Sequence, residues 1–436
     1  MPSGRLERIL HLGRAAGGMA LAGAAEKVRR LGSATAALAE PHVMLTAEAA
    51  QILAARLSRL RGAAMKVGQM LSLEGDNLLP AEFAKALEVL RSSAHHMPEA
   101  QLLSVLEKEY GKSPLERFES FEMKPLAAAS IGQVHAARTK EGDAIVLKIQ
   151  YPGVQGSIDS DVDNLRSLLS LARLVPKGLD LDDFVKEVKL ELHREVDYER
   201  ELEQLEAYRL HAEGDPRLRL PKPYREHSTS RILAMERMFA VPLLTWAETA
   251  SQAERDRMGN LLFELLLREL FVFGLSQTDP NPANFQVQTS DARLVLLDFG
   301  ATRSVTPDVA ALYRLAFEGL MTRNPELIRE VVVNLGVHRA EVPEATELIV
   351  AMALEAAEAF DEPLYDFRAT DLQQRINRYS FGLMKFHGKL GTPPPEYIFF
   401  QRKLTGTFLL GRSLGARIAC RRLAEETLQA SRPALP

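Results

Sequence analysis

The sequence predicts an α+β fold with two lobes, a small one that mixes helices and strands and a larger one that is mainly helical. Three observations support this prediction. A chain of 436 residues can bury two or three hydrophobic cores. The apolar run at 144–149 is partly β-branched, as expected for a strand. Residues 251–275 and 307–425 have helical patterns, broken by the triple proline at 393–395.

Residues 1–32 form a distinct N-terminal segment. They hold six basic and two acidic residues around a centre rich in Gly and Ala. Gly13 and Gly17 have the spacing of small residues at helix–helix contacts. Two interpretations stay open: an amphipathic helix that lies on an anionic membrane or against another helix, and an ordinary surface helix or frayed terminus.

Residues 33–112 are predicted to form a helical extension ahead of the small lobe. Helical spacing covers 46–110, with breaks at Pro80 and Pro98. The extension carries Lys-Val-Gly-Gln at 66–69, which by itself predicts nothing more than a helix surface.

The small lobe is predicted to cover 113–239. Its central strand at 144–149 is followed by helices over 157–212. A short strand at 231–235 then leads into a connector between the lobes at 236–240.

The large lobe is predicted to cover 240–436. Its strongly apolar helix at 251–275 precedes a segment, 276–300, that holds two short motifs. The apolar run Leu294 to Leu297 inside this segment is predicted to be a buried strand.

Composition excludes several classes of protein. The net charge is −4, whereas a nucleic-acid-binding protein usually carries a basic field. Cys420 is the single cysteine, so neither an internal disulfide nor a cysteine metal cluster can form, and a reducing compartment is expected. The ten histidines lack zinc-ligand spacing, and the adjacent pair His95-His96 is predicted to lie in a loop. The sequence shows no secretory signal and no apolar stretch of 18 residues.

The two motifs of segment 276–300 predict phosphoryl chemistry. Asp279 is followed five residues later by Asn284, and Asp298-Phe299-Gly300 begins fourteen residues after that. Protein kinases use an Asp that reaches the attacking hydroxyl, then an Asn and a second Asp that hold metal ions on the phosphates. Each motif alone is weak, since Asp-Phe-Gly also fits a strand and a turn. In this order they predict a protein-kinase-like bilobal fold, with Asp279 catalytic and Asn284 and Asp298 as Mg²⁺ ligands.

Lys148 lies inside the strand at 144–149. A kinase-like fold needs a lysine that reaches from such a strand to the α- and β-phosphates of ATP, whereas a lone lysine is more often a surface residue. We therefore expect Lys148 to bind the nucleotide. The adenine pocket is expected near Met235 and Glu236, where the strand at 231–235 ends.

A segment of small residues upstream of Lys148 takes the place of the kinase glycine-rich loop. Its expected nucleotide-binding residues are Ala127, Ala128, Ala129, Ser130, Ile131, Gly132 and Gln133. Alanine permits close approach of the backbone to phosphate but resists positive φ. The loop is therefore expected to be stiff and helix-prone, with a nucleotide preference unlike that of protein kinases.

A helix from Leu181 is predicted to place one acidic residue on its apolar face. That face comprises Phe184, Val188, Leu192 and Leu202. Glu195 falls within the same arc, where a buried carboxylate needs a partner.

The other acidic residues of this helix are predicted to face different ways. Asp197 and Glu201 point elsewhere on a straight helix, and either Glu195 or Glu201 is expected to pair with Lys148. Glu191, Glu199 and Glu203 are expected to be exposed to solvent.

These segments together resemble the UbiB family of atypical kinase-like proteins, and within it the coenzyme Q biosynthesis branch. The resemblance covers nearly the whole chain. It rests on the segments 66–69, 127–135, 195–197, 279–284 and 298–300, on Lys148, and on Pro393 to Glu396 with Arg402-Lys403. It implies a kinase-like fold whose nucleotide cleft is capped by the N-terminal extension.

The resemblance also assigns regulatory residues. It implies that Lys66 and Gln69 lie over the site that a peptide would occupy in an ordinary kinase. Lys66 would pair with Glu195, Asp197 or Asp298 and restrain transfer to large substrates. Glu195 would then face the extension rather than water.

Two further implications concern the nucleotide site. Glu201 would be the helix partner of Lys148. Many family members have His at the positions of Gln277 and Asn281, so a histidine proton relay is in doubt for this chain. Catalysis would then depend on Asp279, metal charge and positioning.

By this resemblance the chain is expected to be a Mg²⁺-dependent ATPase that supports ubiquinone (coenzyme Q) biosynthesis at a membrane. Its expected partners are ATP or ADP, an anionic lipid surface, isoprenoid quinone precursors, other coenzyme Q biosynthesis proteins and a second copy of the chain. Two other functions stay open: a genuine kinase for a protein or small molecule, and a nucleotide-binding scaffold. The expected location is the cytoplasmic face of a bacterial inner membrane, or else the matrix face of the mitochondrial inner membrane.

Overall fold

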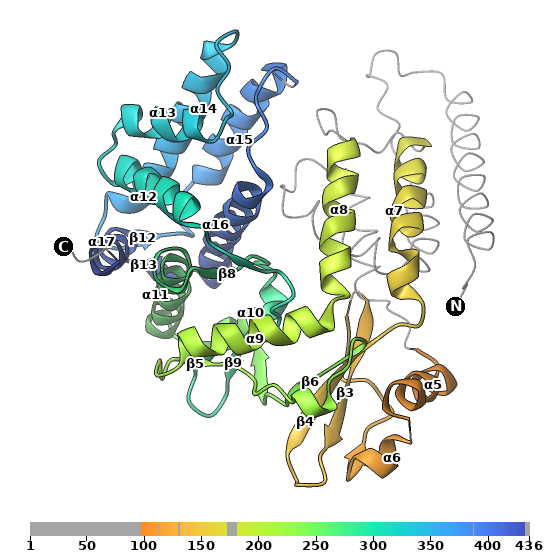
Figure 1. Cartoon of the computed structure of the whole chain (residues 1–436). Coiled ribbons are helices and arrows are strands. Elements are labelled where there is room, and N and C mark those ends of the chain that lie inside the picture. Colours follow the sequence, from red (N-terminus) through yellow and green to blue (C-terminus); the bar gives the residue numbers. More distant parts are fainter. Residues whose placement is uncertain (1–96, 112, 130, 172–180, 387, 432–436) are drawn as a thin grey trace, which may run out of the picture. The chain divides into compact units, whose positions relative to one another are not determined.

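A computed structural model describes residues 97–111, 113–129, 131–171, 181–386 and 388–431 (Figure 1). The predicted regulatory residues Lys66 and Gln69, the pair His95-His96 and Ser130 lie outside these ranges. The described chain divides into two compact units. The first holds the residues up to Glu203 together with Lys222–Arg237, and the second holds Gln204–Pro221 and the residues from Met238 onward. The predicted boundaries at 32, 112 and 239 stay predictions.

The first unit is built on an antiparallel sheet with the strand order β1-β3-β4-β6, in which β2 pairs with β3. Its elements are α5 (Glu99–Tyr110), α6 (Pro114–Arg117), β1 (Ser120–Phe121), β2 (Ala127–Ala128), β3 (Gly132–Arg138), β4 (Ala144–Gln150), α7 (Val154–Leu171), α8 (Leu181–Glu195), the start of α9 (Tyr198–Ala212), η1 (Arg225–His227) and β6 (Ile232–Glu236). The strands predicted at 144–149 and 231–235 are confirmed as β4 and β6.

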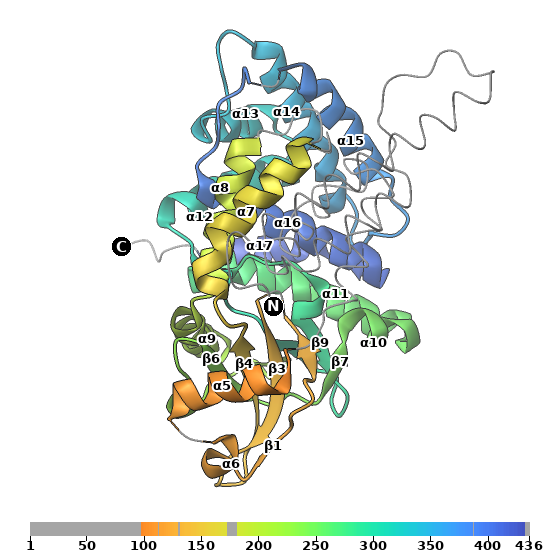
Figure 2. The same ribbon diagram turned by 90° about the vertical axis from the view of Figure 1, so that its right-hand side faces the viewer.

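One face of this sheet is covered by α5, which crosses it in Figure 2. Leu102 and Leu106 of α5 join Ile145, Leu147 and Ile149 of β4 in one buried core. Since successive side chains of a strand point to opposite faces, Lys148 and Gln150 are directed away from this core. The alternation along β4 therefore sets the face on which the predicted nucleotide lysine lies.

The structure divides the helix predicted from Leu181 into two. α8 ends at Glu195 and α9 begins at Tyr198, so Leu202 is not on the apolar face of α8. The cause is Asp197, whose Oδ1 accepts a hydrogen bond from the backbone N–H of Arg200 at 3.0 Å. An aspartate in this position is a favourable helix N-cap, which starts a new helix.

The described residues on both sides of Ser130 pair as a β-hairpin, and the prediction that this segment is helix-prone is wrong. Ala127 and Ala128 pair with Val134 and Gln133, and the N–H of Ala129 donates to the carbonyl of Gly132 at 2.9 Å. Pairing with β3 outweighs the helix preference of alanine. At Gly132 the strands approach so closely that a Cβ would overlap the carbonyl of Ile149.

Replacing Gly132 with alanine is therefore expected to lower the free energy of unfolding by about 1–3 kcal/mol, because two backbones must separate to admit the methyl group. Chemical denaturation measures this change. Gly156→Ala on α7 is the control, since its Cβ would meet nothing within 4 Å. Equal stability of the two variants would contradict the close approach at Gly132.

The second unit combines short sheets with helices. Its sheets have the orders β5-β10-β9-β7, β11-β8 and β12-β13. Its strands are β5 (Leu218–Arg219), β7 (Ala240–Pro242), β8 (Leu275–Gln277), β9 (Phe285–Gln288), β10 (Leu294–Leu296), β11 (Thr302–Ser304), β12 (Tyr365–Asp366) and β13 (Arg417–Ile418). The strand predicted at Leu294 to Leu297 is confirmed as β10.

Helices make up most of the second unit, as predicted. They are the rest of α9, α10 (Leu243–Thr249), α11 (Gln252–Arg268), the π-helical segment η2 (Glu269–Phe273), η3 (Pro282–Asn284), α12 (Pro307–Met321), α13 (Pro325–Asn334), α14 (Pro343–Ala356), η4 (Ala357–Phe360), α15 (Leu372–Leu383), η5 (Met384–Phe386), α16 (Pro395–Leu414) and α17 (Cys420–Ala430). The apolar helix predicted at 251–275 ends at Arg268, and η2 continues it. In the described part of the chain, no helix is long and apolar enough to cross a bilayer.

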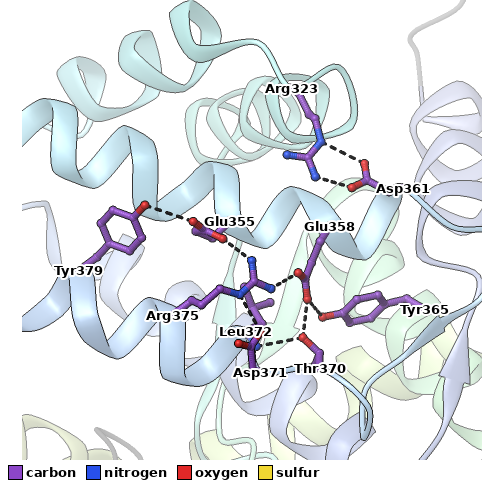
Figure 3. A network of polar contacts seen from close by, with 10 residues as sticks. All are labelled: Arg323, Glu355, Glu358, Asp361, Tyr365, Thr370, Asp371, Leu372, Arg375 and Tyr379. Atoms are coloured by element: carbon purple, nitrogen blue, oxygen red, sulfur yellow. Dashed lines mark hydrogen bonds and ion pairs between the residues drawn. The ribbon is translucent and has the colours of Figure 1, made fainter.

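An arginine at the centre of a polar network joins α14, η4 and α15 (Figure 3). Arg375 pairs with Glu355 and Glu358, and its Nε lies 2.8 Å from Asp371. Glu358 also accepts hydrogen bonds from Tyr365 and Thr370. A guanidinium with several carboxylate partners fixes the helices more firmly than single surface pairs would. This network stabilises the C-terminal helices and holds no residue predicted for the site.

Candidate functional site

Lys148 and Glu201 form a buried ion pair inside the first unit. The Nζ of Lys148 lies 2.9 Å from Oε1 and 2.8 Å from Oε2 of Glu201. Their exposed fractions are only 7% and 1%, and the ring of Tyr198 is centred 5.1 Å from the ammonium. This confirms the predicted contact of Lys148 with Glu201. The pair holds the amine of Lys148 on the face of β4 opposite the core that contains α5.

Gln150 holds the same helix at a second point. It lies two residues after Lys148, so both side chains extend from one face of β4. Its Nε2 donates to the carbonyl of Val196 at 2.6 Å and to that of Ser230 at 3.3 Å. Val196 sits at the break between α8 and α9, so Gln150 positions the start of the helix that carries Glu201. Gln150 is not among the predicted site residues, although a glutamine inside an apolar strand needs a hydrogen-bond partner and so is a recognisable signal.

One prediction for the acidic residues of α8 and α9 is wrong. Glu199 and Glu203 are exposed as predicted. Glu191 is not solvated as expected, since only 4% of it is exposed, and it lies 3.6 Å from Arg194. Glu195 is half-buried at the end of α8, one turn from Glu191.

The side chain of Gln133 is directed into the core of the first unit. Its Oε1 accepts from the N–H of Met97 at 2.9 Å, and its Nε2 lies 2.7 Å from a ring nitrogen of His135. Gln133 can therefore contribute only backbone atoms, and not its side chain, to a nucleotide site. Met235 is buried on β6, and Glu236 accepts from the N–H of Lys222 at 3.1 Å.

The second unit brings the two predicted motifs together by pairing the chain on both sides of them. On one side, Gln277 pairs with Thr302, next to the end of Asp298-Phe299-Gly300. On the other, Phe285 pairs with Leu296, and the N–H of Leu297 donates to the carbonyl of Asn284 at 3.2 Å. The loop from 279 to 284 and the Asp-Phe-Gly turn are thus enclosed between two antiparallel pairings.

Asp279 organises its own loop. Its Oδ1 accepts from the N–H of Asn281 at 3.3 Å, and its Oδ2 accepts from Nδ2 of Asn284 at 3.2 Å. The backbone carbonyl of Asp279 accepts from Nε2 of Gln277 at 2.9 Å and from Nδ2 of Asn284 at 3.3 Å. Asn281 caps the short helix η3 by accepting from the N–H of Ala283. Asp279 and Asn284 are both half-buried, which leaves them accessible to a ligand.

The Asp-Phe-Gly turn is anchored by its phenylalanine. Phe299 is buried, and its ring centroid lies 5.2 Å from that of Tyr208 on α9. Asp298 is half-buried, and its Oδ1 accepts from the N–H of Gly300 at 3.0 Å. Burial of one neighbour therefore fixes the backbone from which Asp298 extends.

The donor atoms of Asn284 and Asp298 fit the chemistry of Mg²⁺. Because Nδ2 of Asn284 donates to Asp279, its Oδ1 is the atom left for another ligand. Mg²⁺ prefers oxygen ligands and often uses one or two protein side chains beside waters and phosphate oxygens. No group of three or more His, Cys, Asp or Glu with metal-site geometry occurs among the described residues. Two protein oxygen atoms suit a metal whose other ligands are waters and phosphate oxygens.

Comparison with known proteins identifies the family. The ABC1 atypical kinase-like domain matches residues 89–332. The chain is 34% identical over 430 residues to the atypical kinase COQ8, mitochondrial, of Saccharomyces cerevisiae, covering 98% of this chain and 85% of that protein. It is 35% identical over 451 residues to the atypical kinase COQ8B, mitochondrial, of Rattus norvegicus, covering 100% and 83%.

A solved structure supports the fold. The complex of Rv3197 with erythromycin from Mycobacterium tuberculosis matches with a TM-score of 0.60 at 24% identity, covering 88% of this chain and 97% of that one. This likeness agrees with the predicted kinase-like α+β fold.

These findings confirm the enzyme class predicted from the sequence, an ATP-dependent atypical kinase linked to ubiquinone biosynthesis. The chain belongs to the ABC1 atypical kinase-like family, in the UbiB and coenzyme Q branch that its motifs resemble.

Proposed function

We propose that this chain is a Mg²⁺-dependent ATPase that transfers the γ-phosphoryl group to water or to a small hydroxyl compound. In this proposal Lys148 binds the α- and β-phosphates, Asn284 and Asp298 hold the metal, and Asp279 orients the attacking oxygen. Mg²⁺, when bound, supplies positive charge that neutralises the phosphates. The protein supplies position and fixed electrostatics, which carry most of the catalysis in phosphoryl transfer.

The observation that carries the proposal is the enclosure of the 279–284 loop and the Asp-Phe-Gly turn between two antiparallel pairings. A metal-binding pair and a catalytic carboxylate must stay close through many turnovers. Pairing at Gln277 with Thr302 and at Phe285 with Leu296 provides that constraint within one unit. The loop itself adds the hydrogen bonds of Asp279 to Asn281 and Asn284.

The first unit supports the proposal through its buried amine. Glu201 and Gln150 fix Lys148 and the start of α9 at two points. The β2–β3 hairpin carries small side chains, with Ala127 exposed and Ala128 and Ala129 half-buried, as close approach to phosphate requires. Ala127 to Gln133, with Met235 and Glu236 for the adenine, are proposed as the rest of the nucleotide site.

The proposed regulation rests on the N-terminal extension. Lys66 and Gln69 would cover the acceptor side of the nucleotide, and Lys66 would pair with Glu195, Asp197 or Asp298. A covered acceptor side favours water or a small molecule over a protein substrate.

The proposed setting is a membrane surface. Residues 1–32 carry six basic residues, which suits contact with anionic lipid. Isoprenoid quinone precursors, other coenzyme Q biosynthesis proteins and a second copy of the chain are proposed partners. The two relatives described above are named as mitochondrial. For this chain we propose the cytoplasmic face of a bacterial inner membrane, with the mitochondrial matrix face as the alternative.

Phosphate release tests the proposal. Purified protein with ATP and Mg²⁺ is expected to release inorganic phosphate, and faster when anionic liposomes and a phenolic quinone precursor are present. Asp298→Asn is expected to lower the rate by about 10²–10³-fold, the usual cost of losing one group that stabilises developing charge. Label from [γ-³²P]ATP on a peptide or lipid instead of in free phosphate would indicate a kinase. Tight ATP binding without turnover would indicate a scaffold.

A further inference from the structure

A buried carboxylate organises the interior of the second unit close to the catalytic loop. Glu269, with an exposed fraction of 0%, begins the π-helical segment η2. Its Oε1 accepts from the hydroxyl of Tyr208 at 2.5 Å, and its Oε2 accepts from the hydroxyl of Ser276 at 2.9 Å. The Nζ of Lys403 on α16 lies 3.2 Å from the same Oε2. Burial, and next the charge of Glu269, raise the pKa of Tyr208 well above its usual value, so its hydroxyl keeps its proton and donates.

Lys403 determines which way the carboxamide of Gln277 is turned. Lys403 is 3% exposed, and its ammonium group can only donate hydrogen bonds. Its Nζ lies 3.4 Å from Oε1 of Gln277. Nε2 of Gln277 must then face the other way, and it donates to the carbonyl of Asp279 at 2.9 Å. The ammonium thus selects the amide orientation that supplies a donor to the catalytic loop.

Gly406 lies one helical turn after Lys403 and contacts the same loop. A Cβ at this position would overlap both Cβ and Cγ of Pro280. Because Pro280 is a rigid ring that directly follows Asp279, it cannot rotate away. Lys403 and Gly406 therefore lie on one face of α16, against which the segment from Gln277 to Pro280 packs.

We propose that this face of α16 is a positioning device for the catalytic loop. Lys403 orients Gln277, Gln277 fixes the carbonyl of Asp279, and Gly406 admits Pro280 at its side. The proposal rests on the proposed role of Asp279 for its effect on turnover, but its effect on the loop can be measured without that role.

Gln277→Glu is the decisive variant because it keeps the shape of the side chain and the contact with Lys403. In the variant, the second carboxylate oxygen takes the place of Nε2. An acceptor then faces the Asp279 carbonyl, which is itself an acceptor. We expect kcat to fall by about 10- to 100-fold with nucleotide affinity unchanged, because the Asp279 carbonyl loses one of its two donors and faces an acceptor in its place. Gln374→Glu, on an exposed position of α15, makes the same change away from the loop and is expected to leave kcat unchanged.

Amide hydrogen exchange provides the readout that does not depend on turnover. The N–H groups of Asn281, Ala283 and Asn284 are hydrogen-bonded within the loop and should be protected. In Gln277→Glu their protection is expected to fall while that of the surrounding helices stays constant.

Gly406→Ala independently tests the contact between α16 and Pro280. The new methyl group must displace Pro280, so the same amides should lose protection and kcat should fall. Gly382→Ala on α15 is the control, since its Cβ would come no closer than 3.8 Å to Leu348.

The outcomes separate this inference from the proposed function. Faster exchange confined to the loop in Gln277→Glu and Gly406→Ala supports the device, and lower kcat in the same variants supports the role of Asp279 as well. Faster exchange with unchanged turnover supports the device and contradicts the role of Asp279. Unchanged protection in Gln277→Glu overturns the inference, even if Gly406→Ala fails to fold.

Discussion

Replacing Lys148 with methionine is expected to lower the free energy of unfolding by about 3–5 kcal/mol, because the buried carboxylate of Glu201 loses the ammonium group that contacts both of its oxygens. Glu201 is 1% exposed and cannot regain water without moving α9. Under the proposed function the same change removes the amine that binds the phosphates. Denaturant unfolding measures the first effect and nucleotide titration the second.

Two variants separate burial from charge in this prediction. Lys189→Met breaks a pair with Asp163 whose N–O distance is also 2.8 Å, but Lys189 is 25% exposed. A surface pair of that kind contributes about 1 kcal/mol or less. The double variant Lys148→Met/Glu201→Leu removes both buried charges and is expected to recover most of the lost stability, since apolar pairs often replace buried ion pairs without cost. It is not expected to recover nucleotide binding. If Lys148→Met were no less stable than Lys189→Met, the burial of the pair would be wrong.

The fold could be predicted where the pattern in the sequence is local. The strand that became β4 and the strand before the Asp-Phe-Gly turn are apolar runs bounded by turns, and both were confirmed. The short strands β8 and β11 have three residues each and carry no pattern of that kind. They form because they pair with each other across 25 residues, which a local pattern cannot reveal.

Competing signals explain two of the errors in the first unit. The alanines at 127–129 favour a helix by propensity, yet the ladder with β3 decides their conformation. Apolar spacing continues from α8 into α9, so periodicity alone predicted one helix, while Asp197 marked the N-cap that divides them. In both places a specific hydrogen bond outweighs an average preference.

The site was predictable in its residue types but not in its supports. Lys148 and Glu201 were expected to meet, and they do. Gln277 was noted only as a departure from histidine, and Lys403 only as part of a resemblance. The two residues are 126 positions apart in the sequence, and Lys403 lies on α16, near the C-terminus. Such a contact depends on tertiary packing, so no spacing rule in the sequence could find it.

Replacing Asp279 with asparagine is expected to lower kcat by about 10²–10⁴-fold, the usual contribution of a group that assists proton transfer in the transition state. Nucleotide affinity should be unchanged, because the proposal gives Asp279 contact with the attacking oxygen and not with ATP. The free energy of unfolding should change by about 1 kcal/mol or less, the net value of one hydrogen bond. An asparagine oxygen can still accept from the N–H of Asn281, and Asn284 keeps the backbone carbonyl as its acceptor.

Asp291→Asn is the matched control for this variant. Asp291 is exposed in the β9–β10 hairpin, and its Oδ1 accepts from the N–H of Arg293 at 3.3 Å, the same local contact that Asp279 makes with Asn281. It therefore reports what an aspartate in such a turn contributes to folding without any chemistry. Normal turnover in Asp279→Asn, measured as phosphate release at saturating ATP, would show that the loop serves structure alone. A loss confined to Asp279→Asn, with both variants equally stable, places the carboxylate charge in the reaction, because both aspartates accept a hydrogen bond from the N–H two residues later.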